Sequence, residues 1–249
     1  MIMDIWTVMR KELIEIFLQR GNTAGSRRGG WLSILLVLGV FGLFLPLQIG
    51  PEWLQRPQLL IFWAWVPLFL VSSVTTDTFA GERERHTLET LLASRLSDRA
   101  ILFGKVAAAV AYGWSLSLLS VAVSVAAVNI VYARGHFLFY PLDVAGLGIL
   151  LSLLASGLSA TAGVLISLRA SSARQAAQIM SVAIMLLLFV PVFGIQALPA
   201  PVQAQIANTL NNASFDKVAI GAAVVLAVAD GGLLLAALAR FQRAKLILD

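Results

Sequence analysis

Cysteine is missing from this chain of 249 residues, and charged residues make up only 12% of it. The lack of cysteine excludes disulfide bonds, thiolate metal sites and cysteine nucleophiles, and it leaves the redox compartment undecided. Soluble domains usually carry about 25% charged residues. The low charge therefore argues against an ordinary soluble fold.

Catalytic signatures are also missing. The sequence has no Gly-x-x-x-x-Gly-Lys-Ser/Thr phosphate loop, no His-Glu-x-x-His helix and no Gly-x-Ser-x-Gly elbow. Its only histidines are His86 and His136. We therefore expect no catalytic residue, no metal site and no cofactor bound by this chain itself.

Long apolar runs are what the sequence has in abundance, since 59% of the residues are hydrophobic. A bilayer core of about 30 Å needs about 20 apolar residues per helix. Trp53, Trp63 and Trp65 near the second run suit a membrane interface. The pattern predicts an all-α integral membrane protein with six transmembrane helices. These are Trp31–Ile49, Leu59–Thr76, Val106–Tyr132, Val144–Leu168, Ile179–Leu198 and Val218–Ala239.

The distribution of positive charge predicts the orientation. Fifteen of the eighteen Lys and Arg residues lie before the first run, in the second and fourth loops, or after the sixth run. The positive-inside rule therefore places both termini in the cytoplasm, and His86 and His136 on opposite sides of the membrane. The net charge of +5 indicates contact with anionic lipid headgroups and not with nucleic acid.

Residues 4–20 have a helical period, with Ile5, Trp6, Met9, Leu13, Ile16 and Phe17 on one face and Asp4, Lys11, Glu12, Glu15 and Gln19 on the other. This pattern predicts an amphipathic helix in the cytoplasmic interface, although docking on a protein surface is the alternative. A glycine-rich basic hinge, residues 21–30, follows. We therefore divide the chain into a unit at 1–30 and one membrane domain at 31–249.

Two loops stand out. The loop 77–105 is the most polar segment, and Leu88, Leu91 and Leu92 in it would form an apolar stripe on a short helix. Ser97 or Asp98 is a plausible N-cap for the next span. The external loop 199–217 is about equally consistent with a surface helix and with an irregular loop.

Asp230 is the one charge inside a predicted span. Placing it there costs roughly 2.5–3.5 kcal/mol on insertion scales. It is either a cation, proton or transport site, or a carboxyl that is protonated or hydrogen-bonded to a neighbouring helix. Small residues recur every four positions in the third and fourth spans, which favours close helix packing over a substrate path. These are Ala109, Gly113 and Ser117, and Ala155, Ser159, Gly163 and Ser167.

The loop after the second span resembles the first cytoplasmic loop of the permease subunits of type-2 ABC exporters. That family typically has Glu-Arg-Glu-x-x-Thr-Leu-Glu-x-Leu-Leu-x-x-Pro and then Gly-Lys. This chain has Glu82-Arg83-Glu84-Arg85-His86-Thr87-Leu88-Glu89-Thr90-Leu91-Leu92-Ala93-Ser94 and later Gly104-Lys105. Arg95 replaces the usual proline. The segment from Trp6 to Leu13 is similar to the family's elbow helix.

The resemblance implies an exporter in which two permease chains, alike or different, surround a central path. Each would place its loop in a groove of a separate ATPase subunit, which would bind ATP and magnesium. Residues 82–92 would be the coupling helix. Its docking charges would be Glu82, Arg83, Glu84, Arg85 and Glu89, with Thr87 beside them, while Leu88, Leu91 and Leu92 would fix the helix in place.

Three alternatives remain open at this stage. The first is an ion-coupled carrier or channel that works without ATP and uses Asp230. The second is an anchor or assembly subunit, which small-residue packing faces would fit equally well. The third, an intramembrane enzyme, is disfavoured by the missing motifs. The sequence does not name the substrate.

Overall fold

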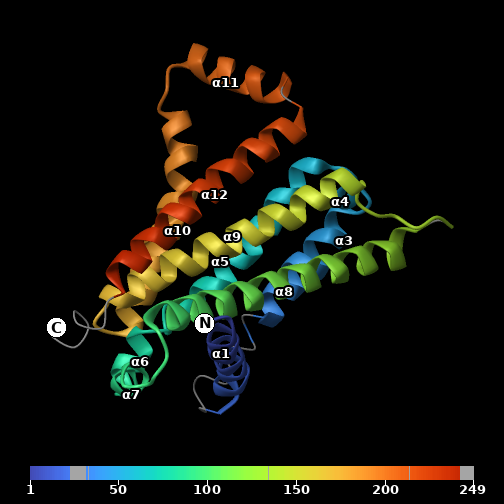
Figure 1. Ribbon diagram of the computed structural model, residues 1–249. Helices are drawn as coiled ribbons and strands as arrows, with labels where there is room; N and C mark the ends of the chain where they lie inside the picture. The colour runs from blue at the N-terminus through green and yellow to red at the C-terminus, as the bar shows by residue number, and fades with distance from the viewer. Residues whose placement is uncertain (23–31, 33, 134, 213, 242–249) are drawn as a thin grey trace.

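A computed structural model describes residues 1–22, 32, 34–133, 135–212 and 214–241 (Figure 1). Helices and short connections account for this part of the chain, with no strand among the described residues. The expected all-α class is therefore confirmed. The glycine-rich segment predicted as a hinge lies mostly outside the described residues.

The helices follow one another along the chain with short connections. In order they are α1 (Ile2–Asn22), the π-helix η1 (Leu38–Phe44), α3 (Leu45–Ile49), α4 (Glu52–Gln55), the 3-10 helix η2 (Pro57–Leu60), α5 (Ile61–Thr75), α6 (Ala80–Glu84), α7 (Leu88–Leu92), α8 (Asp98–Tyr132), α9 (Leu142–Arg169), α10 (Ala173–Gln196), α11 (Ala200–Asn212) and α12 (Phe215–Arg240).

Five helical segments within the described residues are long and apolar enough to cross a membrane: Pro57–Glu84, which contains α5, and the helices α8, α9, α10 and α12. They correspond to the last five of the six expected spans. The first expected span is helical over Ile34–Ile49, which is shorter, and its beginning lies outside the described residues. Pro46 lies where this segment changes from π to α geometry, as is common at prolines.

Helix α8 is longer than the span predicted from hydropathy. It begins at Asp98, eight residues before Val106, and its 35 residues extend over about 52 Å. The side chain of Ser97 accepts a hydrogen bond from the backbone N–H of Ala100 at 3.3 Å, which confirms Ser97 as the N-cap. The residues before Val106 extend α8 beyond its apolar run, toward α6 and α7.

Helix α9 lies at the centre of the bundle and packs against α5, α8 and α12 (Figure 1). Small residues make these contacts close. A Cβ on Gly163 would fall 1.9 Å from Thr75 Oγ1, and one on Gly113 would fall 2.0 Å from Val71 Cγ2. Both small-residue rows therefore serve helix packing, as predicted.

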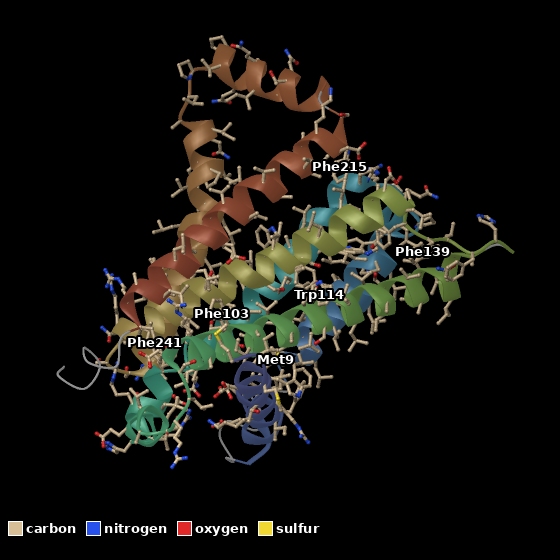
Figure 2. All side chains as sticks on the ribbon, in the orientation of Figure 1. Met9, Phe103, Trp114, Phe139, Phe215 and Phe241 are labelled. Atoms are coloured by element: carbon tan, nitrogen blue, oxygen red, sulfur yellow. The ribbon has the colours of Figure 1, made fainter. Side chains whose placement is uncertain are left out.

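The last three helices are packed less completely than the rest, although α12 contacts α9. Helices α10, α11 and α12 form three sides of a triangle, with α11 joining the outer ends of the other two (Figure 1). The segment 199–217, which we expect to lie outside the cell, is thus largely a helix. Apolar side chains project freely from α10 and α12 (Figure 2), as expected for surfaces that meet lipid or another chain.

Aromatic residues close the end of the bundle opposite α6 and α7. Trp63 contacts Tyr140 edge-on at 5.0 Å, and Trp53 stacks on Phe62 at 5.4 Å. Trp53 and Trp63 are only 2% and 5% exposed. The indoles of Trp53 and Trp63 are therefore covered by neighbouring helices, and their depth at a membrane interface stays a prediction.

Candidate coupling site

The coupling segment predicted as one helix from Glu82 to Leu92 forms two short helices. Helix α6 ends at Glu84, and α7 begins at Leu88. His86 lies between them with a φ of 55°, a left-handed conformation that a continuing α-helix does not contain. The two helices project together from one end of the bundle (Figure 1), which we call the α6–α7 end.

Glu82 points into the protein and not toward a docking partner. Its carboxylate accepts a hydrogen bond from Lys105 Nζ of α8 at 2.9 Å, and Glu12 of α1 accepts another from the same ammonium group at 2.9 Å. The carbonyl oxygen of Thr78 accepts a third at 3.2 Å. The Lys105 side chain is 0% exposed. One buried lysine therefore joins α1, α6 and α8.

Lys11 supplies a second positive charge at the edge of this cluster. Its ammonium lies 3.3 Å from Glu15, 3.4 Å from Glu12 and 3.9 Å from Glu82. Partial burial lowers the pKa of Lys11, but the three neighbouring carboxylates outweigh that effect and raise it above its usual value. Lys11 therefore keeps its charge and helps to neutralise the carboxylates around Lys105.

The residue before the buried lysine, Gly104, lies where α1 crosses α8 closely. A Cβ at this position would lie 2.6 Å from Val8 Cγ1 and 3.2 Å from the carbonyl oxygen of Ile5. Only glycine leaves room for α1 to cross α8 so closely. The close crossing brings Glu12 within reach of Lys105.

A second set of contacts ties the start of α6 to the last turns of α9. Ser167 Oγ accepts hydrogen bonds from the backbone N–H groups of Phe79 at 3.0 Å and Ala80 at 2.9 Å, and donates one to the carbonyl of Thr76 at 3.1 Å. Ser167 is 0% exposed. It thereby satisfies backbone groups at the start of α6 that would otherwise be buried without partners.

Two charged side chains of α6 reach the connection between α9 and α10. Arg83 donates hydrogen bonds to the carbonyl oxygens of Ala170 and, at 3.3 Å, Leu168. Glu84 Oε1 accepts one from the backbone N–H of Ala173, in the first turn of α10, at 3.2 Å. Helix α6 is thus held to α1 and α8 on one side and to α9 and α10 on the other.

Helix α7 is attached by its apolar face. Leu88 is 6% exposed and belongs to the core formed with Phe79 and Ile101, and Leu91 packs on its edge. Leu88 is thus buried and Leu91 partly buried, while their role in fixing the coupling helix stays a prediction. The side chain of Leu92 lies outside what the structure describes.

The outer surface of this end carries four of the predicted docking residues, Glu84, Arg85, Thr87 and Glu89. Arg85 also pairs with Asp77 at 3.0 Å, where both side chains are nearly half exposed. Glu82 and Arg83, in contrast, are engaged inside the protein. The predicted site therefore divides into an exposed part and an anchoring part, and Glu84, which is exposed but also bonded to Ala173, belongs to both.

Sequence reasoning missed the buried cluster. It placed Glu12 on the solvent face of the amphipathic helix, whereas Glu12 is 7% exposed and turned toward α8. Lys105 was noted only as part of the Gly-Lys pair. A signal existed, because a lone lysine at the start of a long apolar run calls for a carboxylate partner. Sequence spacing does not reveal which carboxylate it is.

Asp230 lies apart from the coupling site. Its Oδ1 accepts a hydrogen bond from Thr161 Oγ1 of α9 at 2.9 Å, and it lines a pocket of about 360 Å³ among α8, α9 and α12. A hydrogen bond to a neighbouring helix was one of the two interpretations of this carboxyl. Within the described part of the chain, no three His, Cys, Asp or Glu side chains gather as a metal site would require.

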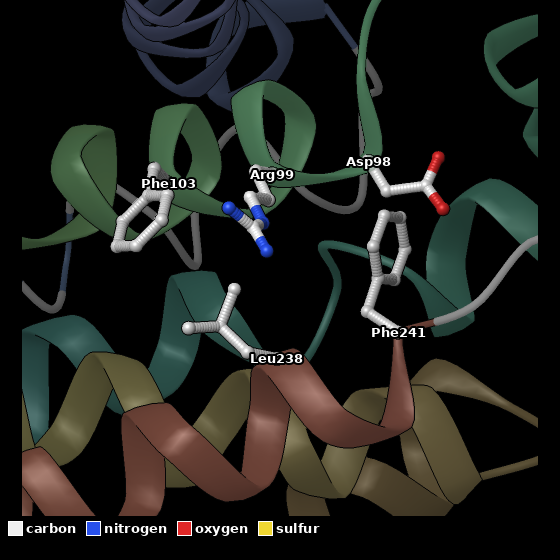
Figure 3. A pocket seen from close by; sticks show the side chains of 5 residues that line it. All are labelled: Asp98, Arg99, Phe103, Leu238 and Phe241. Atoms are coloured by element: carbon white, nitrogen blue, oxygen red, sulfur yellow. The ribbon is translucent and has the colours of Figure 1, made fainter.

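A second pocket, of about 350 Å³, lies between the start of α8 and the end of α12. Figure 3 shows Arg99 and Phe103 on α8 facing Leu238 and Phe241 at the other wall. Phe103 lines both pockets, so the two are neighbours along the same groove.

Comparison with known proteins identifies the family of this chain. No curated protein matches the chain. A family model described as "ABC-2 family transporter protein" matches residues 54–214, which is well over half of the chain and includes α6, α7 and Lys105. The members of this family are the membrane components of ABC transporters, which associate with an ABC ATPase subunit and are not themselves catalytic. This chain therefore belongs to the ABC-2 transporter family and is a multi-pass membrane permease.

Proposed function

We propose that the chain is the permease of an ATP-driven exporter, which moves a substrate outward across the cell membrane together with a separate ATPase subunit. The observation that carries the proposal is the double attachment of α6. This short helix is bonded to α1 and α8 through Lys105 and to α9 and α10 through Ser167, Arg83 and Glu84.

In this proposal the exposed residues Glu84, Arg85, Thr87 and Glu89 meet the ATPase on the cytoplasmic side. The ATPase holds ATP and magnesium, and its closure pushes on α6 and α7. Because Lys105 and Ser167 connect α6 to helices on both sides, the push reaches α8 and α9 together. Displacement of packed helices is a recognised way to transmit such a signal.

The proposal also includes a second permease chain, identical or different, and lipid around the rest of the bundle. The apolar outer surfaces of α10 and α12 support this part, since most of their side chains are exposed. In a membrane such surfaces need lipid or another helix against them. Both termini lie in the cytoplasm in this arrangement.

The test is purification of the tagged chain from its own membrane, followed by an assay of ATP hydrolysis. We expect a stoichiometric ATPase to accompany the chain and to be lost from the double variant Glu84→Ala, Glu89→Ala. Glu52→Ala is the matched control, because Glu52 is an exposed carboxylate at the other end of the bundle. Recovery of the chain alone in several mild detergents would contradict the proposal.

A second candidate is an ion-coupled carrier or channel that works without ATP. It is favoured by one observation, the partly buried carboxylate of Asp230 beside an open pocket among three helices of the membrane domain. Transport into vesicles driven by an ion gradient without ATP would support it. An unchanged cation dependence after Asp230→Asn would exclude it.

A further inference from the structure

The pocket around Asp230 is built around its carboxylate. A Cβ on Gly157 of α9 would lie 2.1 Å from Asp230 Oδ2, so glycine at this position makes room for the carboxyl group. One helical turn away, the hydroxyl group of Thr161 lies 2.9 Å from Oδ1, and its single proton is shared between this oxygen and the carbonyl oxygens of Gly157 and Leu158. Two neighbouring positions of α9 therefore fix how the carboxylate lies.

Asp230 lacks an opposite charge within the described residues, because none of the ion pairs formed there includes it. It lies ten residues before Arg240, about 15 Å along α12 from the end of the helix. An intramembrane carboxylate at such depth usually pairs with a cation or marks a binding path.

The remaining walls of the pocket are apolar. They come from three helices, and Val106, Val110, Leu153, Leu154 and Leu234 are among the lining residues. A volume of about 360 Å³ lies in the range of sites for small organic ligands. The site thus offers one anionic group and a large apolar surface.

The groups that line the pocket suit some cations better than others. A hard metal ion prefers about six oxygen ligands, whereas this pocket presents one carboxylate and one hydroxyl group. A protonated amine needs far fewer acceptors, and an attached apolar body would fill the rest of the space. The pocket therefore fits an organic ammonium ion better than sodium or calcium.

We propose that the pocket among α8, α9 and α12 binds an apolar molecule that carries a protonated amine, with the amine on Asp230. The binding is independent of the proposed coupling to ATP, because it involves none of the contacts of α6. It can be measured without nucleotide, so its failure would leave the exporter proposal intact.

The experiment uses the full purified chain in detergent and two fluorescent probes with the same body, naphthylhexylamine and naphthylhexanol. We expect the amine to bind the native chain at least about tenfold more tightly than the alcohol, because a charged hydrogen bond is lost in the alcohol. Asp230→Asn should remove this difference and leave alcohol binding unchanged. Asp216→Asn, at the far end of α12, is the matched control and should change neither affinity.

A second pair of variants tests the apolar walls. Ala227→Phe would fill the pocket, and we expect it to weaken both probes at least about fivefold. Val228→Phe adds the same side chain at an adjacent position that is 71% exposed, and it should have no effect. Equal affinity of the native chain for the two probes, or unchanged amine binding after Asp230→Asn, would overturn the inference.

Discussion

At the scale of single residues, Lys105 has the largest consequences for this fold. Its ammonium is fully buried, and two carboxylates from different helices depend on it. Taking one partner from such a cluster is costly because the other charges stay buried without compensation. The same reasoning explains why Gly104 precedes it, since α1 must approach closely for Glu12 to reach Lys105.

Lys105→Met tests this role. We expect it to destabilise the chain by about 3–5 kcal/mol, since Glu12 and Glu82 would lose their buried partner and keep only the more exposed and more distant Lys11. In a chain of this size that corresponds to a fall in Tm of roughly 6–20 °C. Thermal unfolding in detergent measures it.

Arg56→Met is the matched control for Lys105→Met. It breaks the exposed pair with Glu52 and should cost no more than about 1 kcal/mol. The triple variant Glu12→Gln, Glu82→Gln, Lys105→Met should recover much of the lost stability, because no buried charge is left. A Tm of Lys105→Met equal to that of Arg56→Met would contradict the assigned role.

At the scale of the element, the break between α6 and α7 separates two tasks. Helix α6 carries the buried anchor Glu82 and the partly buried anchor Arg83, while the segment that follows it presents Thr87 and Glu89 outward. In one continuous helix, the spacing along the sequence would fix the direction of each of these side chains. The kink at His86 changes the direction of α7, and it therefore determines which side chains are exposed.

Substitutions at His86 test the importance of the kink. Its left-handed φ of 55° suits glycine and disfavours β-branched residues. We expect His86→Val to destabilise the chain by roughly 1–2 kcal/mol. His86→Gly should be tolerated without loss of stability. Ala93→Val, at a nearby exposed position with a φ of −74°, is the control.

The readout for these variants is Tm together with recovery of the partner ATPase. If His86→Val were as stable as Ala93→Val and recovered the ATPase equally well, the kink would not matter for the fold or for docking.

At the scale of the whole molecule, the orientation of the chain in the membrane can be tested by thiol labelling. The chain has no cysteine, so only an introduced thiol can react. A single Glu89→Cys at the α6–α7 end and a single Thr209→Cys on α11 would each be the only thiol in the chain. With a membrane-impermeant maleimide on intact cells, we expect only Thr209→Cys to react. Glu89→Cys should react only after the membrane is opened and the ATPase that would cover it is washed off. The reverse pattern would overturn the proposed orientation.

Hydropathy by itself determined most of the architecture. Apolar runs separated by polar loops predicted the helical class and the places of α5, α8, α9, α10 and α12, because lipid requires each span to satisfy its own backbone hydrogen bonds. The small-residue rows in α8 and α9 likewise indicated close packing. The loop pattern around Glu82 and the Gly104-Lys105 pair pointed to the family that the comparison then showed.

Contacts between distant segments were decided only by the tertiary structure. Glu12 and Lys105 are 93 positions apart, and Phe79 and Ser167 are 88 apart, so no local period relates them. The burial of Trp53 and Trp63 and the length of α11 were also hidden, since hydropathy reports how apolar a residue is and not what covers it. Local patterns determine helices because helical bonds are local, whereas a buried charge depends on which helices meet.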